Sequence, residues 1–92
     1  MNHVYLVTYN LKSPGKDYSA FFRELKVTGT WCHYIDSTWL IVSTEKPSEV
    51  YDRVARHLVK GDRILIIEVT SNYWGFLPKK AWDWVKRNLP TK

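Results

Sequence analysis

The sequence predicts an α+β domain with a four-stranded antiparallel sheet, two helices on one face of it and a third helix at the C-terminal end. Three observations support this. Short segments rich in β-branched and aromatic residues alternate with segments whose apolar residues recur every three to four positions. These segments follow one another as strand, helix, strand, strand, helix, strand, which is the split β-α-β order. A chain of 92 residues suffices for one hydrophobic core, so we expect a single domain over residues 1–92.

The first half of the chain supplies a strand, a helix and a hairpin. His3 to Asn10 alternates β-branched and aromatic residues as a strand does. A helix capped by Asp17 runs to about Val27, because four apolar residues fall on one of its faces. These are Tyr18, Phe21, Phe22 and Leu25. Thr30 to Ile35 and Thr38 to Ser43 form two strands, and the short link Asp36-Ser37 between them predicts a tight hairpin.

The second half supplies a helix, a strand and a final helix. Pro47 suits the first turn of a helix whose apolar stripe consists of Val50, Val54 and Leu58. The strand from Arg63 to Val69 is the most apolar, and its composition predicts a strand covered on both faces. Pro78 opens a last helix that runs to about Leu89. The complete order is that of a ferredoxin-like fold with an extra C-terminal helix.

Alternation along the strands assigns their residues to two faces of the sheet. One face carries Val4, Leu6, Thr8, Leu40 and Val42, and the other carries Tyr5, Val7, Tyr9, Trp39 and Ile41. The sequence leaves open which set meets the helices. We expect the working surface to be the sheet face away from the two helices, with Tyr9 and Asn10 on one strand and the hairpin from Trp31 to Trp39 beside them.

Composition bounds the partners and the compartment. A net charge of +5 permits binding to polyanions without requiring it. Five Trp, six Tyr and three Phe are more rings than so small a core buries, which predicts an exposed aromatic patch. We expect the one cysteine, Cys32, to be buried and to pack as a small hydrophobic residue. A chain without an internal disulfide, a signal peptide or an apolar run of membrane-spanning length is expected in the cytoplasm, with no membrane partner.

The hairpin holds the densest group of chemically active residues. His33 is a candidate general acid or base, and Asp36 or Ser37 a candidate substrate contact. Two observations argue against a catalytic pair. His33 and Asp36 are three residues apart, so their side chains would project to opposite faces of an extended strand. The pair Asp36-Ser37 is also common in turns. The three histidines lie in different elements without ligand spacing to a cysteine or carboxylate, so we expect neither a metal nor another cofactor.

Aromatic residues on strands also indicate a surface for single-stranded nucleic acid. Bases stack on exposed rings while lysines and arginines hold phosphates, and Tyr9, Trp31 and Trp39 are candidates for the stacking. Lys79 and Lys80 stand in the first turn of the last helix, where free N–H groups favour an anion. The competing interpretation is a dimer interface, in which Trp and Tyr are also enriched.

Three segments carry a resemblance to known proteins. They are Tyr5 to Leu11, Thr30 to Ile41, and Trp74 to Pro78 together with Ala81 to Val85. They resemble a family of small bacterial and phage proteins labelled SinR-like. More distantly, the plan resembles the CRISPR adaptation nuclease-like proteins and the virulence-associated protein D toxins, which are ferredoxin-like homodimers that include metal-dependent nucleases.

The distant resemblance implies an acidic metal ligand at the end of the first strand. Asn10 stands at the matching position, and an amide oxygen without charge is a poor ligand for a hard cation. The resemblance therefore implies a homodimer that binds RNA, DNA or a nucleotide without metal-dependent nuclease activity. Two alternatives stay open: a protein–protein factor such as a phage or plasmid inhibitor of a host defence system, and an active endoribonuclease toxin using His33 and Asp36.

Overall fold

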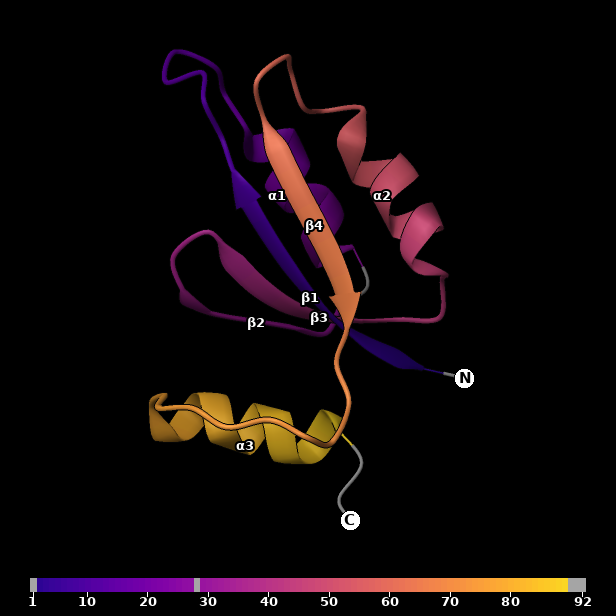
Figure 1. Cartoon of the computed structure of the whole chain (residues 1–92), viewed down its shortest axis with the longest axis vertical. Coiled ribbons are helices and arrows are strands. Elements are labelled where there is room, and N and C mark those ends of the chain that lie inside the picture. The colour runs from indigo at the N-terminus through magenta and orange to yellow at the C-terminus, as the bar shows by residue number, and fades with distance from the viewer. Residues whose placement is uncertain (1, 28, 90–92) are drawn as a thin grey trace.

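The computed structural model of this chain describes residues 2–27 and 29–89, and its elements follow the predicted order (Figure 1). The strands are β1 (His3–Asn10), β2 (Trp31–Ile35), β3 (Thr38–Ser43) and β4 (Arg63–Glu68). The helices are α1 (Ser19–Lys26), α2 (Pro47–Ala55) and α3 (Lys79–Asn88). The predicted α+β fold, with a four-stranded antiparallel sheet and an extra C-terminal helix, is confirmed. No helix in the described part of the chain is both long and apolar enough to cross a membrane.

The sheet interleaves two β-α-β units. Its strand order is β2-β3-β1-β4, and every pair of neighbours is antiparallel. Strand β1 is bonded on both sides, so that Tyr5 lies opposite Ile41 of β3 and opposite Glu68 of β4. Each β-α-β unit therefore has a strand of the other unit inserted between its own two strands, as the ferredoxin-like plan requires. Strands β2 and β4 form the two edges.

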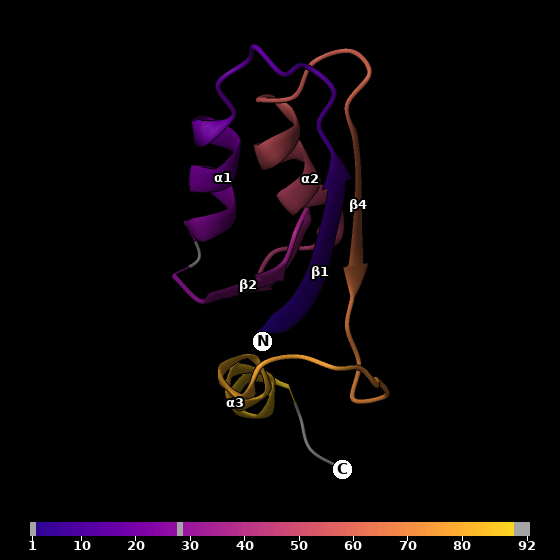
Figure 2. The same cartoon turned by 90° about the vertical axis from the view of Figure 1, so that its left-hand side faces the viewer.

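Helices α1 and α2 lie side by side on one face of the sheet (Figure 2). The core beneath them contains the aromatic set of strand residues, which settles the question that alternation had left open. Its buried members are Tyr5, Val7, Phe21, Leu25, Trp39, Ile41, Val50 and Val54. Large rings on β1 and β3 thus fill the space between the sheet and the helices.

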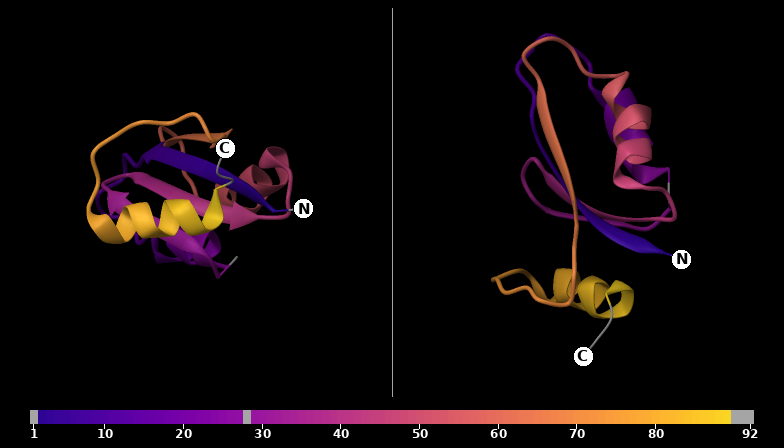
Figure 3. Two further views of the ribbon diagram at one scale, coloured as in Figure 1. Left: turned by 90° about the horizontal axis from the view of Figure 1, so that it is seen from below. Right: turned by 45° about the vertical axis from the view of Figure 1, so that its right-hand side comes forward.

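Helix α3 lies against part of the opposite face, across β2 and β3 (Figure 3). A second core forms there from Val4, Cys32, Ala81, Trp84, Val85 and Leu89. The α3 helix does not cover β4, where Leu65 and Ile67 remain about half exposed while Ile64 and Ile66 pack on the first core. The prediction that β4 is covered on both faces is therefore wrong, because α3 is short and lies over β2 and β3 instead of over β4.

The helix boundaries differ slightly from the predictions. Asp17 accepts a hydrogen bond from the backbone N–H of Ser19 at 2.9 Å, and α1 begins at Ser19. The Glu49 carboxylate accepts a hydrogen bond from the backbone N–H of Lys46 at 2.8 Å, and this contact closes the first turn of α2. That helix ends at Ala55, so Leu58 packs on the core from the turn that follows.

An ionic network centred on Arg53 joins the two covering helices. The Arg53 guanidinium donates to the Glu45 carboxylate at 2.8 Å and to the Glu24 carboxylate at 3.2 Å, and it also bonds the Glu24 backbone oxygen. His57 lies 3.3 Å from the second oxygen of the same Glu24 carboxylate. The hydrogen bond from Arg53 lowers the pKa of Glu45. Burial opposes a similar shift at Glu24, but the bonds from Arg53 and His57 outweigh it and lower the pKa of that carboxyl as well.

This network predicts a pH-dependent contribution to stability. We expect Arg53→Met to reduce the free energy of unfolding by about 1–3 kcal/mol at neutral pH, because two half-buried carboxylates lose their donor. A carboxylate with a lowered folded pKa stabilises the native state above the unfolded pKa of about 4.3, and the stabilisation disappears as the pH falls through the folded pKa. The variant should therefore lose less stability on acidification than the wild type does.

Urea unfolding followed by tryptophan fluorescence, repeated from neutral pH to about pH 3, measures this difference. The matched control is Arg56→Met, which removes an exposed arginine three residues away on the chain. An Arg53→Met protein with the same acid dependence as the wild type would show that the network does not contribute in this way.

Candidate nucleic-acid interface

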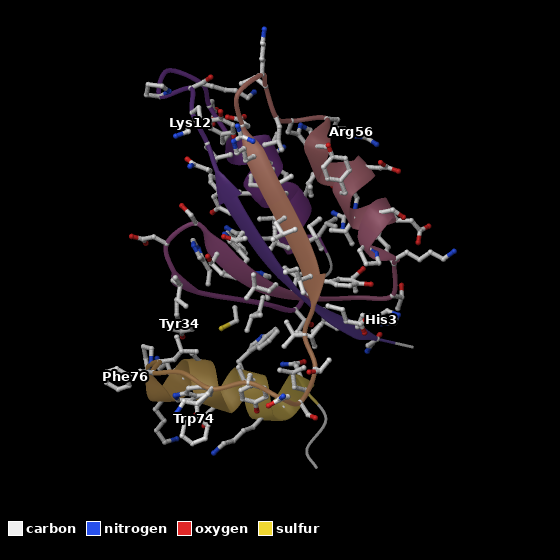
Figure 4. The ribbon with its side chains drawn as sticks, in the orientation of Figure 1. His3, Lys12, Tyr34, Arg56, Trp74 and Phe76 are labelled. Carbon is white, nitrogen blue, oxygen red and sulfur yellow. The ribbon has the colours of Figure 1, made fainter. Side chains whose placement is uncertain are left out.

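A groove runs between the edge strand β2 and helix α3. It has a volume of about 550 Å³. Its walls are formed by Trp31, Cys32, His33, Tyr34, Lys80, Asp83, Trp84 and Arg87. Strand β2 lines it with four consecutive residues, Trp31 to Tyr34, and α3 lines it with Trp84 and three charged residues. Figure 4 shows Tyr34 reaching from β2 toward the N-terminal end of α3.

The rings of β2 rest on Trp39 of the neighbouring strand. The His33 ring lies 4.3 Å from the Trp39 ring, centroid to centroid, and the two planes are inclined by only 16°. The Trp31 ring lies 5.1 Å from the Trp39 ring at an inclination of 42°. Trp39 itself is only 3% exposed, whereas Trp31 is 39% exposed and His33 is also open to solvent. A buried ring thus supports two accessible ones.

Hydrogen bonds fix the position of Trp39 and of the hairpin. The indole Nε1 of Trp39 donates to the hydroxyl of Tyr9 at 2.9 Å. Ser37 adopts a left-handed backbone conformation with a φ of 59°, which a two-residue hairpin turn favours. The Ser37 carbonyl accepts the backbone N–H of Tyr9 at 3.0 Å and the hydroxyl of Thr8 at 3.3 Å. The turn is therefore bonded to β1, which anchors the end of the edge strand β2 next to the turn.

Positive charges stand on both sides of the rings. The Lys26 Nζ atom lies 5.1 Å from the centre of the Trp31 ring, within the range of a cation–π contact. Across the groove, Lys80 and Arg87 are exposed and lie two helical turns apart on one side of α3. The intervening Asp83 carboxylate lies 3.2 Å from the Lys79 ammonium, which offsets its charge.

The titratable groups beneath the groove are held in their neutral forms. Burial raises the pKa of the Tyr9 phenol, and this effect exceeds the opposing hydrogen bond from Trp39. Burial likewise raises the pKa of the Cys32 thiol. A protonated thiol is a weak nucleophile, so Cys32 is poorly suited to act as one.

The structure brings some of the predicted site residues together. Trp31, His33 and Lys80 line one groove, with Trp39 beneath the two rings. Tyr9 packs edge-on against Phe21 in the main core at 5.2 Å. The expectation that Tyr9 and Trp39 lie on the sheet face away from the two helices is therefore wrong. These large rings fill the space under α1, whereas small and branched residues occupy the other face.

The remaining predicted residues lie elsewhere. Asn10 is exposed at the end of β1, opposite Arg63, and does not line the groove. Asp36 is exposed in the turn, and within residues 2–27 and 29–89 it shares no hydrogen bond with His33. Ser37 serves the turn through its backbone, and Lys79 pairs with Asp83. The same residues contain no group of three or more His, Cys, Asp or Glu side chains placed to hold a metal ion.

Sequence reasoning missed three residues around the groove: Lys26, Tyr34 and Arg87. Tyr34 shares the parity of Cys32, so a known position for α3 would have placed it toward that helix. Arg87 follows Lys80 by seven residues, a spacing that puts both on one side of a helix. The approach of Lys26 to Trp31 depends on how α1 packs across β3, for which the sequence holds no local signal.

Comparisons with models of protein families, with curated proteins and with solved structures give no match to this chain.

The burial of Cys32 generates a prediction about its reactivity. We expect the native thiol to react with a disulfide reagent such as DTNB at least about 10-fold more slowly than the thiol of the urea-unfolded chain, because it is inaccessible and protonated. The absorbance of the released thiolate at mildly alkaline pH measures both rates. Equal rates would mean that α3 does not cover β2 in solution.

Proposed function

We propose that this chain is a nucleic-acid- or nucleotide-binding module that holds single-stranded RNA or DNA in the groove between β2 and α3. One observation carries the proposal: the accessible rings of Trp31 and His33, supported by the buried Trp39, lie on the edge strand β2, whose groove with α3 is also lined by the cations Lys80 and Arg87. Stacking rings beside cations are the two components by which proteins hold single strands.

Each component has a separate task in this proposal. The Trp31 and His33 rings stack against bases, which any sequence offers because every base has an aromatic face. Lys80 and Arg87 attract the phosphates that connect those bases. Because Trp39 already holds the rings in place, little side-chain freedom is lost on binding. The net charge of +5 adds a long-range attraction to any polyanion.

The proposal concerns binding without cleavage. Asn10 supplies no negative charge at the end of β1, and Arg63 stands opposite it, which is an unfavourable setting for a divalent cation. The distant relationship to the CRISPR adaptation nuclease-like and protein D toxin group, and a cytoplasmic location, remain part of this proposal.

Binding predicts two distinct effects of mutation. We expect Trp31→Ala to weaken binding of a labelled single-stranded oligonucleotide by about 1–3 kcal/mol, the range for one lost base–aromatic stack. The double variant Lys80→Ala and Arg87→Ala should weaken binding and also make it less dependent on salt. The slope of log K against log salt should become shallower by about 0.7 for each lost phosphate contact. Fluorescence anisotropy over a series of salt concentrations measures both quantities.

The matched control is the double variant Arg56→Ala and Lys60→Ala, which removes the same charge from two exposed residues outside the groove lining. Figure 4 labels Arg56 at the C-terminal end of α2. This control variant should keep the contacts that the groove makes with the oligonucleotide. It should lose only the long-range attraction that its lower net charge no longer supplies. Absence of salt-sensitive binding to RNA, DNA and nucleotides in the wild type would refute the proposed function. Equal losses in both double variants would show that the groove is not the site.

Cleavage is tested separately. We expect no degradation of RNA or DNA with Mg²⁺ or Mn²⁺, because the described residues hold no cluster of metal ligands. Gel analysis of labelled substrates, with EDTA as a control, measures this. Metal-dependent cleavage that Asn10→Ala abolishes would overturn the non-catalytic interpretation. Cleavage that His33→Ala abolishes would favour the endoribonuclease alternative.

A further inference from the structure

Helix α3 and the sheet leave a space between them. Leu6 of β1 lies opposite Leu40 of β3, on the face of the sheet that α3 partly covers. A cavity of about 210 Å³ lies against these two leucines and is also lined by Trp82 and Val85 of α3 and by part of the segment, residues 69–78, that joins β4 to α3. We call it the α3 cavity. The proposed function makes no use of it.

The lining of the α3 cavity carries no charge. None of its lining residues is Asp, Glu, Lys, Arg or His. The Thr38 hydroxyl, one of its few polar groups, already lies 3.2 Å from the Thr8 hydroxyl. A charged ligand would lose its hydration here without gaining a counter-charge, which is costly. Water is also poorly accommodated, because a stable buried water needs two to four polar partners.

Aromatic rings and an opening to solvent determine what can enter. The Trp82 ring stacks on the Tyr73 ring, with the centroids 6.1 Å apart and the planes inclined by 20°, and both residues line the cavity. Tyr34 and Ile35 also line it and are 49% and 52% exposed, so the cavity reaches the surface near the end of β2. A small molecule can therefore enter without unfolding of the chain.

The size of the α3 cavity suits a small aromatic molecule. An apolar cavity of about 150 Å³ in another protein stays dry and binds benzene. At about 210 Å³ the α3 cavity has room for a slightly larger ring system, but not for a long acyl chain. A nucleobase would fit by volume, but its several polar groups would lose hydrogen bonds to water in an apolar site.

We propose that the α3 cavity binds a small, uncharged aromatic molecule of about the size of indole. The ligand would gain packing contacts with Leu6 and Leu40 that the empty space does not supply. Within the described part of the chain, the indole N–H of Trp82 and the hydroxyl of Tyr73 take part in no hydrogen bond. They remain available to a single polar group on the ligand, as is usual in sites that are otherwise apolar.

This proposal does not rest on the proposed nucleic-acid function. The α3 cavity and the groove lie against different residues of α3, but Cys32 and Tyr34 line both. Substitutions at these two residues would therefore disturb both sites. A test of the cavity needs residues that line it alone, and Val69 and Leu77 meet this condition.

Nuclear magnetic resonance of the ¹⁵N-labelled full chain, titrated with indole, tests the proposal. We expect the indole N–H signal of Trp82 to shift in a saturable manner, with a dissociation constant of about 1 mM or tighter for so small a ligand. The signal of Trp31, which lines only the groove, should stay in place. The analogue indole-3-acetate should bind at least about 10-fold more weakly, because its carboxylate finds no counter-charge in the cavity.

Two substitutions that fill the cavity locate the site. Val69→Phe and Leu77→Phe each add a larger side chain from the connecting segment, and each should weaken indole binding at least about 10-fold because the space is taken. The matched control is Val59→Phe, which enlarges a 39% exposed valine outside the cavity lining and should bind indole as the wild type does. Dispersed amide signals show which variants are folded, and two filling variants keep the test valid if one is not.

Several results would overturn the proposal. They are the absence of a saturable shift, equal shifts of the Trp31 and Trp82 signals, and indole binding by both folded filling variants with wild-type affinity. Binding of indole-3-acetate as tight as that of indole would exclude an uncharged ligand as the preferred one. None of these results bears on the oligonucleotide titrations, so the proposed function and this proposal can fail separately.

Discussion

The structure depends on one constraint: the strands are apolar on both faces, and three short helices have to cover them. In β3, Trp39 and Ile41 face α1 and α2, while Leu40 and Val42 face the other way. The first set is enclosed completely. Helix α3 has ten residues and covers the second set over β2, β3 and the Val4 end of β1. The same face of β4 lies beyond the reach of α3, so Leu65 and Ile67 stay about half exposed.

Trp39 links the core to the proposed binding groove. The same indole packs near Phe22 in the core, bonds Tyr9 and stacks on His33. A residue that supports both stability and a surface ring leaves that ring little freedom, since the core beneath it is close-packed. The packing of the core thus fixes the position of the surface ring. A substitution of Trp39 would alter the core and the groove together.

Much of the fold was predictable because its signals are local. Alternation located β1 and β3, the apolar spacing located α1 and α2, and Asp36-Ser37 marked the hairpin. No local signal assigns the two faces of the sheet to the helices, because Tyr5 on one face and Val4 on the other are both apolar. For the same reason the site was only partly predictable. Trp31, His33 and Lys80 were identified by residue type, but their meeting in one groove depends on where α3 packs, and the residues of α3 do not encode its distance from β2.

The extended course of residues 69–78 has a consequence for how α3 belongs to its chain. At about 3.3 Å per residue, such a segment can span roughly 30 Å. Helix α3 joins the body through side-chain packing on β2 and β3, without sheet hydrogen bonds. The same packing is available on the sheet of a neighbouring molecule, so α3 can be exchanged between chains, as in domain swapping. The amount of exchanged material would then depend on the concentration at which the chain folded, and it would persist for as long as unfolding of the second core is slow.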